Sequence, residues 1–173
     1  MLLLNLNKIR TAQDRIEQVY RPDQFEADED FRVVAPVSLA FDIFKDKQAF
    51  RLVGRVQTTL ELECSRCLEP FTAPVDQEFD LRYQPHTVHA GEGERENEED
   101  DLTTAFYEHD EIDVGHLMHE QFVLALPMKP LCSDACHGLC PICGTNLNKG
   151  KCDCKPVWED PRLAVLKKLK AES

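Results

Sequence analysis

The sequence lacks the common signatures of an enzyme and of a membrane protein. Its 173 residues contain no run of about 18 consecutive apolar residues, which excludes a membrane-spanning helix. No G-x-S-x-G elbow, glycine-rich phosphate loop or H-E-x-x-H helix occurs. Pairs of carboxylates, which could act in acid–base catalysis, lie mostly between residues 92 and 101. Nothing in that segment would hold the two groups in a fixed geometry. We therefore predict that the protein is not an enzyme and that neither a small-molecule substrate nor a membrane is its partner.

Basic residues are also scarce. The 20 Lys and Arg residues are outnumbered by 32 Asp and Glu residues, which gives a formal net charge of −12. This charge disfavours nonspecific binding to nucleic acids, because proteins contact phosphates mainly through Lys and Arg. The balance reverses between residues 128 and 170, where Lys149, Lys151 and Lys155 are the candidate contacts with RNA or another partner. The alternative is a solvated surface whose positive charge offsets nearby metal-thiolate units.

No secretory signal is evident either. Residues 1–5 form a brief apolar run that no basic stretch precedes, so we expect this segment to belong to the mature protein. We therefore expect a soluble intracellular protein whose thiols are reduced.

Cysteine, by contrast, is abundant. Short spacers let one turn of backbone direct two thiolates at one ion, and eight thiolates suit two structural zinc sites. A disulfide framework would need an oxidising compartment and usually a small secreted domain, and we expect neither. The eight residues are a C-x-x-C at Cys64 and Cys67, and a later group at Cys132, Cys136, Cys140, Cys143, Cys152 and Cys154.

The spacing of the cysteines predicts how they divide between two ions. The C-P-I-C-G run that begins at Cys140 has the form of a zinc knuckle, whose final glycine permits a positive φ, and the later C-x-C can close the same site. The two remaining pairs of cysteines, Cys64 with Cys67 and Cys132 with Cys136, would form a site that cross-links distant parts of the chain. The alternative division groups Cys132, Cys136, Cys140 and Cys143 and leaves the C-x-x-C alone. We predict one site from Cys140, Cys143, Cys152 and Cys154, and another from Cys64, Cys67, Cys132 and Cys136.

Other uses of these residues are less well supported. A thioredoxin-like C-x-x-C would open a helix after a strand, whereas a strand follows here. A redox or zinc-storage sensor would need labile metal and an exposed thiol of low pKa. His116 and His119 are three apart on a predicted helix, but we place them at the surface or core edge because the cysteines complete the ligand count.

Extended segments dominate the first half of the chain. Period-two patterns at residues 50–64 and 71–83 predict half-buried strands, and the C-x-x-C lies at the tip of the hairpin between them. Leu2, Leu4 and Leu6 suggest a short strand, and residues 31–44 favour one or two strands around Pro36. Residues 11–30 are polar and predict a connection with one helical turn.

The second half predicts a helix over residues 112–126. Asp113 can cap it, its apolar residues recur at i, i+3 and i+4, and Pro127 ends it. Asp160 and Pro161 begin a short basic amphipathic helix in the tail. We predict an α+β fold: a mainly antiparallel sheet with a zinc-knuckle hairpin, one packed helix and a C-terminal cysteine-rich zinc module. The predicted divisions are a β-rich domain at 1–90, an acidic disordered loop at 91–111, and the helix, zinc module and C-terminal helix at 112–173.

Four motifs follow one another along most of the chain: LECSRCLEPF at 62–71, LALPMKPLC at 124–132, GLCPICGTNLN at 138–148 and DPRLAVL at 160–166. This combination resembles the bacterial YceD-like family of large ribosomal RNA subunit accumulation proteins. The resemblance implies a role in the synthesis, processing or stability of 23S ribosomal RNA in the bacterial cytoplasm. It implies no known enzymatic activity.

Two kinds of contact are compatible with such a role. The chain can contact precursor ribosomal RNA through its basic cysteine-rich end. Alternatively, it is a zinc-stabilised interaction module that binds a basic large-subunit ribosomal protein through its acidic surface, with an indirect effect on RNA. The net charge favours the second as the direct contact, since opposite charges attract over about a Debye length, roughly 8 Å at physiological salt.

Overall fold

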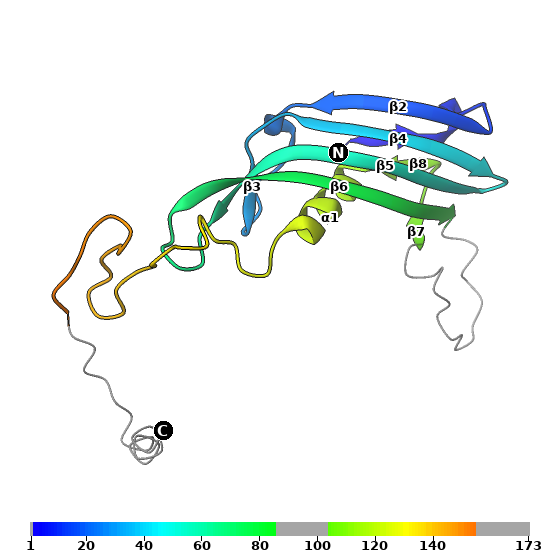
Figure 1. The fold of residues 1–173 in the computed structure, drawn as a ribbon. Coiled ribbons are helices and arrows are strands. Elements are labelled where there is room, and N and C mark those ends of the chain that lie inside the picture. The colour runs from blue at the N-terminus through cyan, green and yellow to red at the C-terminus, as the bar shows by residue number, and fades with distance from the viewer. Residues whose placement is uncertain (1, 86–103, 155–173) are drawn as a thin grey trace, which may run out of the picture.

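The computed structural model describes residues 2–85 and 104–154 (Figure 1). The acidic run at 91–101, Lys155 and the predicted tail helix lie outside the described residues. The described chain forms strands β1 (Leu3–Asn5), β2 (Gln13–Tyr20), β3 (Phe31–Val33), β4 (Val37–Asp46), β5 (Ala49–Glu63), β6 (Pro70–Pro85), β7 (Thr104–Tyr107) and β8 (Glu111–Asp113), helix α1 (Val114–Ala125), and two 3-10 turns, Leu6–Lys8 and Pro22–Gln24.

The strands form one large sheet and one small sheet. The large sheet has the order β2-β4-β5-β6-β7, β3 also pairs with β5, and β1 pairs with β8 in the small sheet. Within the described chain β6 and β7 are parallel, and the other pairs are antiparallel. The mainly antiparallel α+β fold predicted from the sequence is therefore confirmed. The hairpin of β5 and β6 is paired from Phe50 opposite Tyr83 to Glu63 opposite Pro70, which carries the C-x-x-C far out at its tip.

The core lies between the sheet and α1, which runs beneath one sheet face (Figure 1). Alternate residues of β5, such as Leu52, Val56 and Leu60, are fully buried on that face. From α1, Phe122 is fully buried and its ring meets those of Phe25 and Phe31 edge-on at 5.9 and 6.0 Å. One cluster of buried residues extends from Leu6 to Phe122, so α1 packs in the same core as the strands.

Helix α1 has the capping residue that its sequence predicts, but it spans Val114–Ala125 rather than residues 112–126. The Asp113 carboxylate accepts hydrogen bonds from the backbone N–H groups of Gly115 and His116, which satisfies donors that no earlier helical carbonyl can reach. Ile112 lies in β8 rather than in the helix, one residue before the cap. Among the described residues, no helix is long and apolar enough to cross a membrane.

Two parts of the sequence prediction are wrong. The polar segment 11–30 contains β2, which pairs along its whole length with β4, although the segment also contains one helical turn, the 3-10 turn at Pro22–Gln24. Strand β2 lies at the sheet edge and turns mainly Ile16 and Tyr20 toward the core, so its apolar alternation is weak. Residues 104–107 of the predicted loop form β7, whose short length gives little pattern to read.

Gly54 permits close packing in the middle of the sheet. It lies between Phe41 and Phe79 on neighbouring strands, and a Cβ atom there would overlap the Phe41 side chain and the Ala40 carbonyl oxygen. Gly54→Ala should therefore lower the free energy of unfolding by about 1–3 kcal/mol in urea titrations, because overpacking forces the backbone to shift. Gly150→Ala is the control, since its Cβ would have open space around it. Equal stability of the two variants would contradict this packing.

Candidate metal centre

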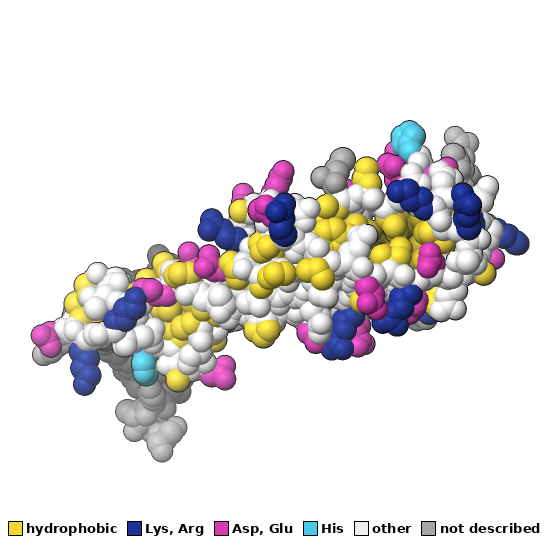
Figure 2. Space-filling view, turned by 90° about the horizontal axis from the view of Figure 1, so that it is seen from above, with side chains coloured by type: hydrophobic (Ala, Val, Ile, Leu, Met, Phe, Trp, Pro, Cys, Tyr) yellow, Lys and Arg dark blue, Asp and Glu magenta, His cyan; other side chains and the backbone are white. Residues whose placement is uncertain are grey.

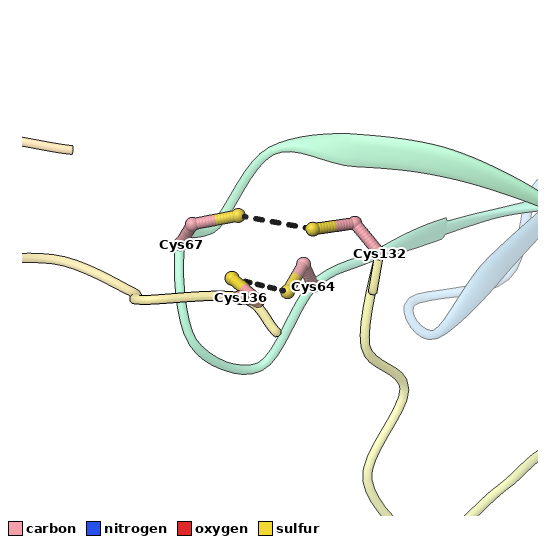
Figure 3. A group of neighbouring side chains, drawn as sticks. All are labelled: Cys64, Cys67, Cys132 and Cys136. Carbon is pink, nitrogen blue, oxygen red and sulfur yellow. Dashed lines mark hydrogen bonds between the residues drawn. The ribbon is translucent and has the colours of Figure 1, made fainter. Parts of the chain in front are cut away.

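Two groups of four cysteines are brought together by the fold. The hairpin cluster consists of Cys64 and Cys67 at the β5–β6 tip and Cys132 and Cys136 from the segment that follows α1 (Figure 3). The other group, here the C-terminal cluster, consists of Cys140, Cys143, Cys152 and Cys154. These are the two sets that the sequence spacing favours, and they differ from the alternative that leaves the C-x-x-C alone.

Sulfur separations in the hairpin cluster fit a tetrahedral metal site. The Cys64 and Cys136 Sγ atoms are 3.8 Å apart, and those of Cys67 and Cys132 are 3.7 Å apart. All four lie within 4.8 Å of one another. Four sulfurs about 2.3 Å from a central ion at tetrahedral angles would be separated by about 3.8 Å, whereas bonded sulfurs lie about 2.05 Å apart. The cluster therefore has the dimensions of a four-thiolate metal site and not of two disulfides.

The hairpin tip is shaped by a tight backbone turn. The Cys64 N–H donates to the Glu69 carbonyl at 3.0 Å, and the Leu68 N–H donates to the Cys64 carbonyl at 2.9 Å. Leu68 has a φ of 57°, a conformation that costs a non-glycine residue energy and persists where the surroundings hold it. The turn directs both thiols to one side, where Cys64 and Cys67 are buried.

The segment after α1 is fastened to the same tip. The Ser65 N–H donates to the Pro130 carbonyl at 2.9 Å, and the Leu139 N–H donates to the Arg66 carbonyl at 3.0 Å. The Arg66 guanidinium donates in return to the Cys136 carbonyl at 2.9 Å. These bonds place the second pair of sulfurs opposite the first, so the cluster joins parts of the chain that are far apart in sequence.

Polar neighbours favour the metal-binding thiolate form at Cys64 and Cys136, whereas burial and the neighbouring thiols raise the pKa of Cys132. The Cys132 backbone N–H interacts with the Cys64 sulfur and is the main reason that the pKa of Cys64 falls to about 6. The Asn148 side chain donates to the Cys136 sulfur at 3.3 Å and lowers the pKa of Cys136. Both interactions stabilise negative charge on sulfur, and the thiolate is the form of cysteine that acts as a metal ligand.

The C-terminal cluster is built around a second tight turn. The Gly144 N–H donates to the Cys140 carbonyl at 2.9 Å, and Gly144 has the positive φ, 72°, that the sequence predicts for a knuckle. The Thr145 hydroxyl lies 3.1 Å from the Cys143 sulfur and is the first cause of a Cys143 pKa of about 6. The four sulfurs lie within 4.8 Å of one another, so this group also could hold one ion.

The two clusters are linked by polar contacts. Glu69, which follows the hairpin tip, accepts from the Lys149 ammonium at 2.7 Å and from the Asn146 amide at 3.3 Å. The Leu147 N–H donates to the Gly138 carbonyl. Gly138 has a φ of 73° and lies against the Arg66 backbone. Lys149 is a candidate partner contact from the sequence, but its pairing with Glu69 is not indicated there, because no local pattern reveals a contact between positions so far apart.

Other candidate residues have separate roles. Lys149 is engaged with Glu69, while Lys151 is exposed and free to meet solvent, and Lys155 lies outside the described residues. His119 lies 2.6 Å from the Asp28 carboxylate, and His116 lies 3.4 Å from that of Glu120. Neither histidine belongs to a metal-binding group among the described residues.

Comparison with known proteins assigns the chain to a family. Residues 52–170 match the family model described as Large ribosomal RNA subunit accumulation protein YceD. The chain belongs to the YceD family. The matched region contains most of β5, all of β6, α1 and all eight cysteines, so both cysteine clusters lie within the part of the chain that defines membership.

Relatives in the YceD family come from bacteria and plants. The chain is 30% identical over 140 residues to the Large ribosomal RNA subunit accumulation protein YceD of Haemophilus influenzae, across 75% of each protein. It is 28% identical over 158 residues to the chloroplastic YCED homolog 1 of Arabidopsis thaliana, and 29% identical over 152 residues to that of Zea mays. These alignments cover 79% and 70% of this chain but 49% of each plant protein, so the chain spans about half their length. No solved structure matches the chain.

Proposed function

We propose that this chain is a non-enzymatic factor that supports the synthesis, processing or stability of 23S ribosomal RNA, and thereby the formation of the large ribosomal subunit. The observation that carries the proposal is the match to the YceD family model over residues 52–170, together with relatives named for large ribosomal RNA subunit accumulation. A location in the bacterial cytoplasm stays a prediction, because the family includes proteins named as chloroplastic.

The metal in this proposal is zinc, with one ion in each cluster. Tetrahedral sets of four sulfur ligands are typical of zinc or of iron–sulfur centres, and zinc carries out no redox chemistry of its own. Four thiolates leave no open coordination position for a substrate or an activated water, which supports a structural role for the ion. The hairpin cluster would then fasten the sheet to the cysteine-rich segment and make one rigid body for docking.

A second candidate function is binding to a basic large-subunit ribosomal protein, with an indirect effect on RNA. The charge distribution favours this contact. Figure 2, which looks down on the sheet face opposite α1, shows no single gathering of basic side chains on that face. Arg51 and Arg55 are instead paired there with Asp80 and Asp76. Because this chain has a net charge of −12, a basic protein is a better electrostatic partner for it than a polyphosphate.

Depletion of the protein tests the proposed function directly. We expect the ratio of large to small ribosomal subunits in sucrose gradients to fall, with a matching loss of 23S ribosomal RNA, because the factor supports accumulation of that RNA. Expression of the wild-type chain should restore both quantities. Unchanged ratios after complete depletion would count against the function.

Crosslinking in cells separates the two kinds of contact. RNA crosslinks at Lys149, Lys151 or Lys155 would favour direct binding to precursor RNA. Recovery of ribosomal proteins without RNA would favour the interaction module.

A further inference from the structure

A groove separates the end of α1 from the base of the hairpin tip. Its volume is about 540 Å³. Apolar side chains from α1 and the following loop line one wall: Val123 is half exposed, and Met128 is fully exposed. Leu62 and Glu63 from the end of β5 line the other wall. Exposed apolar side chains grouped around a hollow often mark a binding surface.

The rim of this groove is negatively charged. Glu29, Asp30 and Glu63 line it, and among the described lining residues none is Lys or Arg. The C-terminal end of α1 lies at the same place, and its last turn contains no basic residue. The helix dipole therefore adds partial negative charge to that of the three carboxylates. A phosphate backbone would be repelled here, and a cation would be attracted.

The hairpin cluster holds the two walls of the groove together. One wall precedes Cys64 directly, and the other leads through Pro130 to Cys132. The Ser65 N–H bond to the Pro130 carbonyl joins them at 2.9 Å, and Figure 1 shows the chain running from α1 to the hairpin tip. The shape of the groove therefore depends on the same contacts that assemble the four sulfurs.

We propose that this groove binds a basic segment of a partner protein, with an apolar side chain between Val123 and Met128 and flanking Lys or Arg residues against Glu29, Asp30 and Glu63. The inference deepens the second candidate function, since it names the surface and the chemistry of the segment that it recognises. The apolar wall gives the segment an anchor, and the acidic rim selects its charge. A purely electrostatic attraction to the whole chain would need neither feature.

A fluorescein-labelled peptide composed of Lys and Leu residues tests the groove. Its binding to the full zinc-loaded chain is measured by fluorescence anisotropy. Glu29→Lys combined with Asp30→Lys should weaken binding about tenfold, because two attractions become two repulsions and each exposed charge pair contributes a factor of about two. The control is Asp46→Lys combined with Glu108→Lys, which changes the net charge equally at exposed positions outside the groove. We expect this control to bind within about twofold of the wild type.

A second pair of variants tests the apolar anchor. Met128→Ser should weaken binding about tenfold, because it removes an apolar contact that the ligand would bury. Leu124→Ser is its control, since Leu124 is also an exposed apolar residue near the end of α1 but does not line the groove. A peptide with Ser in place of each Leu should bind the wild type about tenfold more weakly than the Lys–Leu peptide does. Met128→Ser should not weaken the binding of this Ser-substituted peptide any further.

Several outcomes would overturn the proposal. Equal weakening by the groove variants and by their controls would show a diffuse charge effect. Competition by a single-stranded RNA would indicate a nucleic-acid site. Peptide binding that appears only after removal of residues 156–173 would mean that the chain's own tail fills the groove. Each result leaves the role in ribosomal RNA accumulation standing, because the depletion experiment tests that role separately.

Discussion

Cys64→Ser is expected to release about one of two bound zinc equivalents, measured by elemental mass spectrometry of the purified chain. Cys64 is fully buried at the hairpin tip, and its sulfur lies 3.8 Å from that of Cys136. Binding of a structural zinc ion contributes about 10–16 kcal/mol in zinc-finger peptides, and in a site that joins distant segments this energy holds them together. We therefore also expect faster tryptic cleavage after Arg66 at the hairpin tip, whose carbonyl and guanidinium are bonded to the segment that carries Cys136.

Cys143→Ser is the matched control for this experiment. It should also release about one zinc equivalent, but from the C-terminal cluster, whose ligands lie close together in the sequence. Cleavage after Arg66 should then stay slow, because the contacts between the hairpin tip and residues 130–136 are intact. Retention of all metal by Cys64→Ser would contradict the division of the cysteines described above.

Phe122→Ala should produce the largest loss of stability in the apolar core. The Phe122 side chain is fully buried and contacts Phe25 and Phe31 where α1 meets the sheet. Removing a buried aromatic ring leaves a cavity as well as losing burial, and such substitutions cost about 3–5 kcal/mol. Denaturant titration followed by circular dichroism would measure the change in the free energy of unfolding.

Leu124→Ala in the same helix provides the comparison for Phe122→Ala. Leu124 is 72% exposed, so its truncation should change the free energy of unfolding by about 0.5 kcal/mol or less. If both variants unfold at the same denaturant concentration, α1 does not pack on the sheet as described.

The long hairpin could be predicted from sequence because its pattern is local. Strands β5 and β6 turn one parity of residues into the core over many positions, so the period of two is evident. Strand β2 gives a weak signal, since edge strands need few apolar residues and are often charged. Its identity as a strand depends on pairing with β4, which no pattern within residues 13–20 reveals.

The candidate site was predictable to a similar extent. Cysteine spacing limits which thiols can reach one ion, so the two groups followed from the sequence. The surrounding contacts did not, because the Asn146 amide meets the Glu69 carboxylate across 77 residues, and Asn148 supports the Cys136 sulfur from a different loop. The acidic groove likewise combines residues from three separate segments.

X-ray absorption at the zinc edge, together with the metal content of the freshly purified chain, tests the central claim most directly. We predict about two zinc ions per chain, each surrounded by about four sulfur atoms at about 2.3 Å. A protein without metal, zinc bound mainly by nitrogen or oxygen, or mass mapping that finds these thiols joined as disulfides would contradict a body held together by two four-thiolate ions.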